Sequence, residues 1–428
     1  MFAIFSGLTA LSAAGAGSAA AAAVAAFTPA LHWIQRWLPL FFVPTLVVLP
    51  IAAQAVAPED MAKVGGLVLL GMPLTLFVTA GLVAAIRAVT NVSVLPVPPV
   101  APLPPFTAAH GAGWALATLV GLAGATMLSE GARAGVARAV EEPIGLAADA
   151  TGLGGLRDFA TPDGVARACK SLFLLGATVG GLLLGSGVSP AALAPYLPHP
   201  VVTTALAGTG ACALLGAVTG DGYWGAMEMY LTKSKDGRPA GPGDALMGFL
   251  GCVVLSFGFH IYGQRALLFR HGAEVIGCAA GSALISMVGT VAAGRAMGLP
   301  PDISLAVAPR SVTVALAMPI AEQIGAPSDL IPVCATAVVL TGLLGAASVQ
   351  RLLNLARIAD PVTRGLSTAG SCHGLGTAAL AAKEPNALPF CALAYGLIGV
   401  AASCWAAIPQ VRAMLHALAG KQALVEDA

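Results

Sequence analysis

The chain has 428 residues, of which 57% are hydrophobic and only 10% are charged, and its mean hydropathy is +0.85. Because a soluble domain carries about 25% charged residues, this chain has too little polar surface for water, and we expect an integral membrane protein. The net charge of +1 argues against a nucleic-acid partner. Long stretches rich in Ala, Leu, Val and Gly favour bilayer-crossing helices over a β-barrel.

In chain order, the apolar stretches predict an all-α polytopic membrane protein with about 12 transmembrane helices. The predicted spans are 3–26, 37–56, 64–88, 112–130, 167–187, 201–219, 244–262, 272–297, 303–324, 330–352, 362–382 and 389–412. A Pro-rich linker at 89–111, containing VLPVPPVAPLPP, separates a front region (1–88) from a body (112–428).

Lys and Arg residues concentrate in the segments that follow even-numbered spans. These segments include Lys63, Arg295, Arg357, Arg364 and Lys421. The positive-inside rule therefore predicts that both termini face the cytoplasm or its organellar equivalent.

Two phrases recur in the body three spans apart. VTTALA (202–207) matches VTVALA (312–317), and GCAAGSA (277–283) aligns with SCHGLGTA (371–378). A shift by an odd number of spans inverts topology, so the matches predict inverted repeats near 200–297 and 303–384, as in many secondary transporters. Chance similarity in an Ala-rich chain is the alternative.

A charged group at membrane depth, Arg310, directly follows Pro309 at the predicted start of a helix. Helix N-termini favour anions, and a guanidinium matches a carboxylate, so Arg310, Ser311 and Thr313 predict an organic-anion site. The alternative is that Arg310 extends to the lipid headgroups.

A second polar stretch, GSCHGLGTAALAAKE (370–384), contains glycines that allow a helix to break and expose backbone donors. We expect Ser371, His373, Gly374, Gly376 and Thr377 to bind substrate there. His373 is also a candidate proton carrier, and a packing histidine is the alternative.

The pair Lys383 and Glu384 ends this stretch. Both are candidates for proton coupling, or they mark the point where the helix leaves the membrane. The sequence contains no nucleotide-binding, nucleophile or metalloprotease motif, so we expect a protein that is not an enzyme and that uses neither a metal nor a cofactor.

Four stretches of the body resemble the LrgB/CidB family. They are PRSVTVALAMPIAEQIG (309–325), VVLTGLLGA (338–346), RIADPVTRGL (357–366) and SCHGLGTAALAAKE (371–384). The front region resembles LrgA through IQRWLPLFFVPTLVVLP (34–50). The fusion of both regions, and the ending AAKEPNALPFCALAYGLIG (381–399), are similar to plastidal glycolate/glycerate carriers of plants and algae. Since Met1 aligns inside an early span of that family, we expect the front region to be N-terminally incomplete.

This resemblance implies a secondary carrier of small 2-hydroxy monocarboxylates in the chloroplast inner envelope. It would exchange glycolate for glycerate in photorespiration, with protons as a coupling partner. It also implies broken helices and an elevator architecture like that of cation/proton antiporters. The alternatives are a pyruvate or acetate carrier, a murein-hydrolase export modulator of the LrgAB/CidAB type, and a cation/proton antiporter. The oligomeric state stays open, a homo-oligomer included.

Overall fold

A computed structural model describes residues 2–54, 56–93, 105–128, 161–188, 197–232, 239–381 and 384–421. Within these ranges every regular element is a helix. Residues 94–104 of the predicted linker (89–111) and the candidate residue Lys383 lie outside the described residues. The chain divides into a large unit (Met1–Arg36, Ala52–Leu103 and Leu250–Ala428) and a small unit (Trp37–Ile51 and Pro104–Phe249).

The small unit is a helical bundle in which α8 packs against both α5 and α9. Its helices are α5 (Ala108–Met127), α8 (Pro162–Gly185), α9 (Pro200–Thr219), α10 (Gly222–Tyr230) and α11 (Pro242–Gly248). Small residues allow the helix backbones to approach closely, as at Gly181 of α8, where an added Cβ would lie 2.6 Å from that of Ala207. Helices α2 (Gly17–Val47) and α3 (Leu49–Gln54) cross the boundary between the units.

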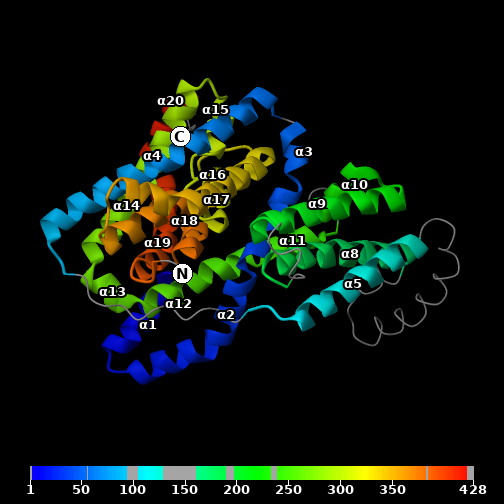
Figure 1. Cartoon of the computed structure of the whole chain (residues 1–428), viewed down its shortest axis with the longest axis horizontal. Coiled ribbons are helices and arrows are strands. Elements are labelled where there is room, and N and C mark those ends of the chain that lie inside the picture. The colour runs from blue at the N-terminus through cyan, green and yellow to red at the C-terminus, as the bar shows by residue number, and fades with distance from the viewer. Residues whose placement is uncertain are drawn as a thin grey trace, which may run out of the picture. The chain divides into compact units, whose positions relative to one another are not determined.

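The large unit contains the remaining helices, several of which begin with a proline at a position where the missing N–H is not needed. They are α1 (Phe2–Ala13), α4 (Pro58–Thr90), α12 (Leu250–Gly263), α13 (Arg265–Arg270), α14 (Gly272–Ala296), α15 (Pro301–Ala306), α16 (Val314–Gln323), η3 (Ser328–Leu330), α17 (Ile331–Leu355), α18 (Pro361–Ala381), α19 (Leu388–Ala407) and α20 (Pro409–Ala419). Helices α14, α16, α17, α18 and α19 lie together at its centre (Figure 1).

Helices α4 and α14 run antiparallel and give the large unit two ends. At one end Lys63 Nζ donates to Gly298 O at 3.2 Å, and we call this the Lys63 end. At the other, Arg87 lies 3.6 Å from Glu274, and we call this the Arg87 end.

The segment from α15 to η3 leaves the Lys63 end and returns to it. At its start, Asp302 pairs with Lys421 at 2.6 Å. At its finish, Ile324 O accepts a 2.7 Å hydrogen bond from His416 Nε2 on α20, and α20 also packs on α15 and α14. Between them, residues 307–313 reach halfway along α14, where Ser311 Oγ lies 2.7 Å from Ser286 Oγ. We call this element the α15–α16 hairpin and residues 307–313 its tip.

Helix α18 also reverses direction, but from the Arg87 end. Its helical conformation is broken at Cys372 (φ −141°) and His373 (φ 44°). A continuous helix would separate residues 364 and 384 by about 30 Å. Instead Arg364 Nε donates to Glu384 Oε2 at 2.6 Å, so the first half (361–371) and the second half (374–381) lie side by side. We call this element the α18 hairpin and residues 372–373 its tip.

Nine helical stretches of the described residues are long and apolar enough to cross a membrane. The predicted spans 303–324 and 362–382 are not among them, because these segments form the two hairpins. At the N-terminus, the predicted spans 3–26 and 37–56 become the short helix α1 and one long stretch, Gly17–Ile51. The helical membrane fold and the helix break after Gly370 are confirmed, and the count of 12 is not.

The predicted sidedness was wrong for the large unit, because two of the counted spans do not cross. Lys63, Arg295 and Lys421 lie at the Lys63 end, where Arg295 Nη1 donates to Ala417 O at 2.8 Å. Arg357 and Arg364 lie at the opposite end and line one pocket there. Because basic residues lie at both ends, the positive-inside rule predicts no orientation for this unit.

Candidate functional site

Arg310 lies in the tip of the α15–α16 hairpin and is only 2% exposed, so it does not extend to the membrane surface. Its Nε donates to Thr290 Oγ1 of α14 at 3.1 Å, and its Nη2 donates to Thr75 Oγ1 of α4 at 2.9 Å. Its Nη1 has no hydrogen-bond partner among the described residues, and none of their ion pairs includes it. A buried guanidinium held by neutral hydroxyls retains its full capacity to bind an anion.

The same tip presents the N-terminus of α16. Thr313 is the N-cap residue, and its side chain makes no capping hydrogen bond. The first backbone N–H groups of α16 therefore lack a side-chain acceptor, and together with the helix dipole they favour negative charge at this point. Ser311, two residues earlier, bonds to Ser286 of α14.

His373 forms the tip of the α18 hairpin and is 3% exposed. Its Nε2 lies 3.0 Å from Val338 O of α17. Because a carbonyl oxygen only accepts, Nε2 carries the hydrogen, and neutral His373 has its Nδ1 left as an acceptor. The positive φ of 44° is unusual for a residue with a side chain and identifies a constrained position.

The other predicted binding residues of this hairpin contact neighbouring parts of the protein. Ser371 donates to Ser367 O at 2.8 Å, and Thr377 Oγ1 lies 3.1 Å from Cys391 Sγ of α19. At Gly376 an added Cβ would lie 2.9 Å from Thr368 Cγ2, so this glycine lets the two halves of the hairpin meet. At Gly374 an added Cβ would have only an ordinary 3.8 Å contact, with the ring of Tyr395.

The two tips approach the same stretch of α14 from opposite ends. The α15–α16 tip contacts Ser286, while Gly370, just before the α18 tip, would place a Cβ 3.1 Å from that of Ser282. Ser282 and Ser286 are one helical turn apart, about 6 Å. Ser282 Oγ is buried and has no hydrogen-bond partner among the described residues, like Arg310 Nη1. Unpaired donors, a buried cation and a helix N-terminus therefore meet near the middle of α14.

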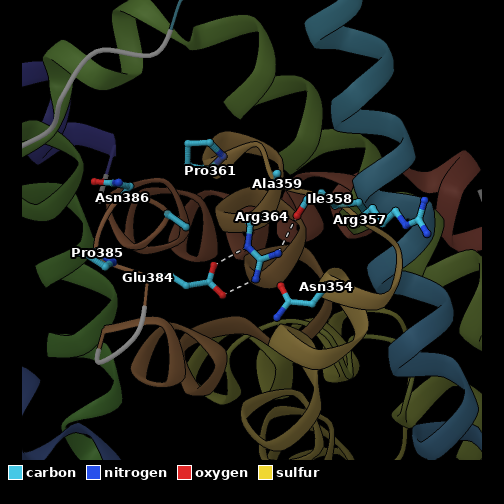
Figure 2. Close-up of a pocket in the computed structure, with 10 residues that line it drawn as sticks. Asn354, Arg357, Ile358, Ala359, Pro361, Arg364, Glu384, Pro385 and Asn386 are labelled. Carbon is cyan, nitrogen blue, oxygen red and sulfur yellow. Dashed lines mark hydrogen bonds and ion pairs between the residues drawn. The ribbon is translucent and has the colours of Figure 1, made fainter.

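A pocket of about 760 Å³ opens at the Arg87 end, at the base of the α18 hairpin (Figure 2). Arg364 spans its floor: Nε and Nη2 both donate to the carboxylate of Glu384, and Nη1 donates to Ile358 O at 2.7 Å. Asn354 lies beside this pair, whereas the side chain of Arg357 points away from it (Figure 2). Glu384 is therefore at the foot of the hairpin, in a bidentate ion pair, away from the tip that carries His373.

Sequence reasoning missed the residues that hold Arg310. These are Thr75 of α4 and Thr290 of α14. Sequence reasoning also missed the buried hydroxyls of Ser282 and Ser286 on α14, because both helices looked like ordinary apolar spans. The available signal was the spacing of 282, 286 and 290 at every fourth residue, which places them on one helix face. Among the described residues, no group of three or more His, Cys, Asp or Glu side chains is arranged to hold a metal ion.

Two comparisons with known proteins found a match for this chain. The model of the LrgB-like family matches residues 193–410. The plastidal glycolate/glycerate translocator 1 of Arabidopsis thaliana is 36% identical over 395 residues, which cover 92% of this chain and 70% of that relative. No solved structure matches the chain. The chain therefore belongs to the LrgB-like family of membrane proteins.

Proposed function

We propose that this protein is a secondary carrier of small 2-hydroxy monocarboxylates that exchanges glycolate for glycerate. The observation that carries the proposal is Arg310, a buried cation without an ion-pair partner among the described residues, located where two hairpin tips converge. The name of the Arabidopsis relative supports the substrate class. It also supports a location in the chloroplast, which we extend to the inner envelope and to photorespiration.

The substrate carboxylate would bind Arg310 Nη1 and the N-terminus of α16, near Ser311 and Thr313. The α18 tip, from Ser371 to Thr377, would close over the substrate, with the backbone of Gly374 and Gly376 nearby. The Nδ1 acceptor of His373 is suited to the 2-hydroxyl group, because a hydroxyl donates where a carboxylate cannot. This gives a reason for preferring a 2-hydroxy acid over pyruvate or acetate.

Alternating access would come from an elevator-type movement in which the hairpins and their partner helices carry the substrate. Each hairpin is held at its own end of the large unit, so opening either one exposes the tips to one side. We propose that the Arg364–Glu384 pair steadies the α18 hairpin. His373 and Glu384 remain candidates for proton coupling, as does Lys383, and the carrier would work as a homo-oligomer.

The test is counter-exchange of labelled glycolate against glycerate by the purified chain in liposomes. We expect Arg310→Gln to abolish exchange, and also to abolish thermal stabilisation by glycolate, which amounts to about 2.7 kcal/mol at 100 times the Kd. Arg351→Gln is the matched control, because Arg351 is exposed on α17. Wild-type exchange by Arg310→Gln would refute the site, and stronger competition by pyruvate than by glycerate would refute the substrate class.

A further inference from the structure

A buried charged cluster lies at the Arg87 end of the large unit, on the side of α14 that faces α4. Its centre is Arg87, whose Nε lies 3.0 Å from Asp360 Oδ2 and whose Nη1 lies 3.6 Å from Glu274 Oε1. Thr90 Oγ1 donates to the same Glu274 oxygen at 3.0 Å. The cluster joins three elements: α4, the first turn of α14 and the residue before α18.

The charges of this cluster do not balance. Arg87 supplies one positive charge, while Glu274 and Asp360 supply two negative charges. Asp360 has the shorter contact with Arg87, and it also accepts hydrogen bonds from the backbone N and Oγ1 of Thr363, at 2.8 and 2.6 Å. The Glu274 side chain is 1% exposed, and its Oε2 has no hydrogen-bond partner among the described residues. Glu274 is therefore the carboxylate whose charge is least compensated.

His271 stands beside this carboxylate and is completely buried. Its Nδ1 lies 3.6 Å from Glu274 Oε1, and neither ring nitrogen has a hydrogen-bond partner among the described residues. Its other close neighbour is the ring of Phe390 on α19, in an edge-to-face contact at 5.2 Å. At this separation the two groups form an ion-pair contact rather than a hydrogen bond. One proton, bound either by the imidazole or by the carboxylate, makes the cluster neutral.

The remaining nearby cations are engaged elsewhere. Arg270, the residue before His271, donates to the backbone and hydroxyl oxygens of Ser93. Arg364, on the first turn of α18, pairs with Glu384. Neither of these guanidiniums forms an ion pair with Glu274 or Asp360, so the balance depends on Arg87 and a proton.

The cluster is connected to the anion site by one face of α14. Glu274 is followed at every fourth residue by Cys278, Ser282, Ser286 and Thr290, all of them buried. Ser286 contacts the α15–α16 tip and Thr290 holds Arg310. A polar row in an otherwise apolar helix thus runs from the Arg87 end to the substrate.

We propose that His271 and Glu274 form the proton-binding site that couples this carrier to a proton gradient. The proposal rests on the proposed transport function. The pair binds one proton from the Arg87 end, and this proton compensates the charge of the Glu274 carboxylate. On release it leaves again as a proton, and no other bond is made or broken. Proton binding lets Arg87 pair with Asp360 alone, which changes how α4 holds the start of the α18 hairpin.

The experiment measures protons and substrate together in liposomes that contain the full chain and a trapped pH-sensitive dye. Glu274→Gln has nearly the same shape and makes the cluster neutral without a proton. We expect it to retain glycolate/glycerate counter-exchange but to lose glycolate-dependent proton movement and the pH dependence of net uptake. Glu59→Gln is the matched control, because Glu59 is exposed on the first turn of α4, and it should behave as wild type.

A second variant makes the same charge change at another position. Asp360→Asn keeps an N-cap residue for α18 but removes one negative charge. The positive charge of Arg87 then balances that of Glu274 without a proton, so this variant should also lose proton movement. Wild-type proton movement per glycolate in a folded Glu274→Gln or Asp360→Asn protein would overturn the proposal. So would net uptake of glycolate by the wild type without any proton movement.

A measurement without transport separates this proposal from the function on which it rests. In infrared difference spectra of the purified chain on acidification, we expect a protonated-carboxyl band that is absent from Glu274→Gln. If the wild type exchanges no glycolate but shows this band, the proposed substrate is wrong and the proton site stands. An identical band in both proteins overturns the proton site.

Discussion

Substituting Gly71 on α4 tests whether the position of Arg310 determines substrate affinity. A Cβ added at Gly71 would lie 2.5 Å from Arg310 Nη2 and 2.9 Å from Cζ, whereas ordinary contacts begin at 3.4 Å. The guanidinium must therefore retreat from α4 by about 0.9 Å. Because Thr75 is also on α4, this retreat lengthens the 2.9 Å bond from Nη2 to Thr75 beyond hydrogen-bond range.

The expected magnitude follows from the lost bond. The same displacement moves Arg310 Nη1 away from the substrate carboxylate. A hydrogen bond to a charged group contributes about 1.5–3 kcal/mol, so losing it at the substrate corresponds to a loss of roughly 10- to 150-fold in affinity for glycolate. The fold itself should hardly suffer, since the neighbour is the end of a flexible side chain. Alanine is also favoured over glycine in a helix by up to about 1 kcal/mol.

The assay compares Gly71→Ala with Gly81→Ala, a substitution on the same helix that meets no atom within 4 Å. We expect both variants to unfold at or above the wild-type temperature, and only Gly71→Ala to raise the KM for glycolate in reconstituted exchange. Equal KM values for the two variants would refute the reasoning, because the placement of Arg310 would then not matter to the substrate.

Three further predictions concern the α18 hairpin. Cysteines replacing Arg364 and Glu384, in a chain without its native cysteines, should be joined by one short bis-maleimide cross-linker. No cross-linking would indicate a continuous helix, with the pair about 30 Å apart. Glu384→Ala should lower the free energy of unfolding by about 1–3 kcal/mol, because it leaves the mostly buried guanidinium of Arg364 without its ion-pair partner. A double-mutant cycle should show that this loss disappears when Arg364 is also replaced by Ala. Gly376→Ala should destabilise the hairpin by about 1–3 kcal/mol through its contact with Thr368, while Gly374→Ala should not, and equal melting temperatures would contradict the packing described.

The break in α18 was predictable from its glycines, but its direction was not. A cluster of Gly370, Gly374 and Gly376 indicates that a helix can stop there. Whether the chain then continues or reverses depends on contacts with residues far away in sequence. Here these are Val338 of α17, which binds His373, and the pairing of Arg364 with Glu384.

The surroundings of Arg310 were predicted only in part, and the binding of an anion there remains a prediction. Arg310 does lie beside a helix N-terminus, but this helix begins at Val314. The residues before Val314 form a turn. Hydropathy alone assigns these residues to one continuous span. The hydroxyl groups that hold Arg310 come from α4, which the domain prediction assigned to the front region, and from α14. The predicted repeats near 200–297 and 303–384, and the domain boundaries, remain predictions.

The uncompensated charge of Arg310 has a consequence for the direction of transport. An empty site carries a positive charge inside a poorly polarisable interior, and moving one charge through a membrane potential requires about 2.3 kcal/mol per 100 mV in addition to its desolvation. A bound monocarboxylate cancels that charge. The loaded carrier is then free to reorient and the empty one is held back, so exchange of one anion for another should be faster than net uptake of either.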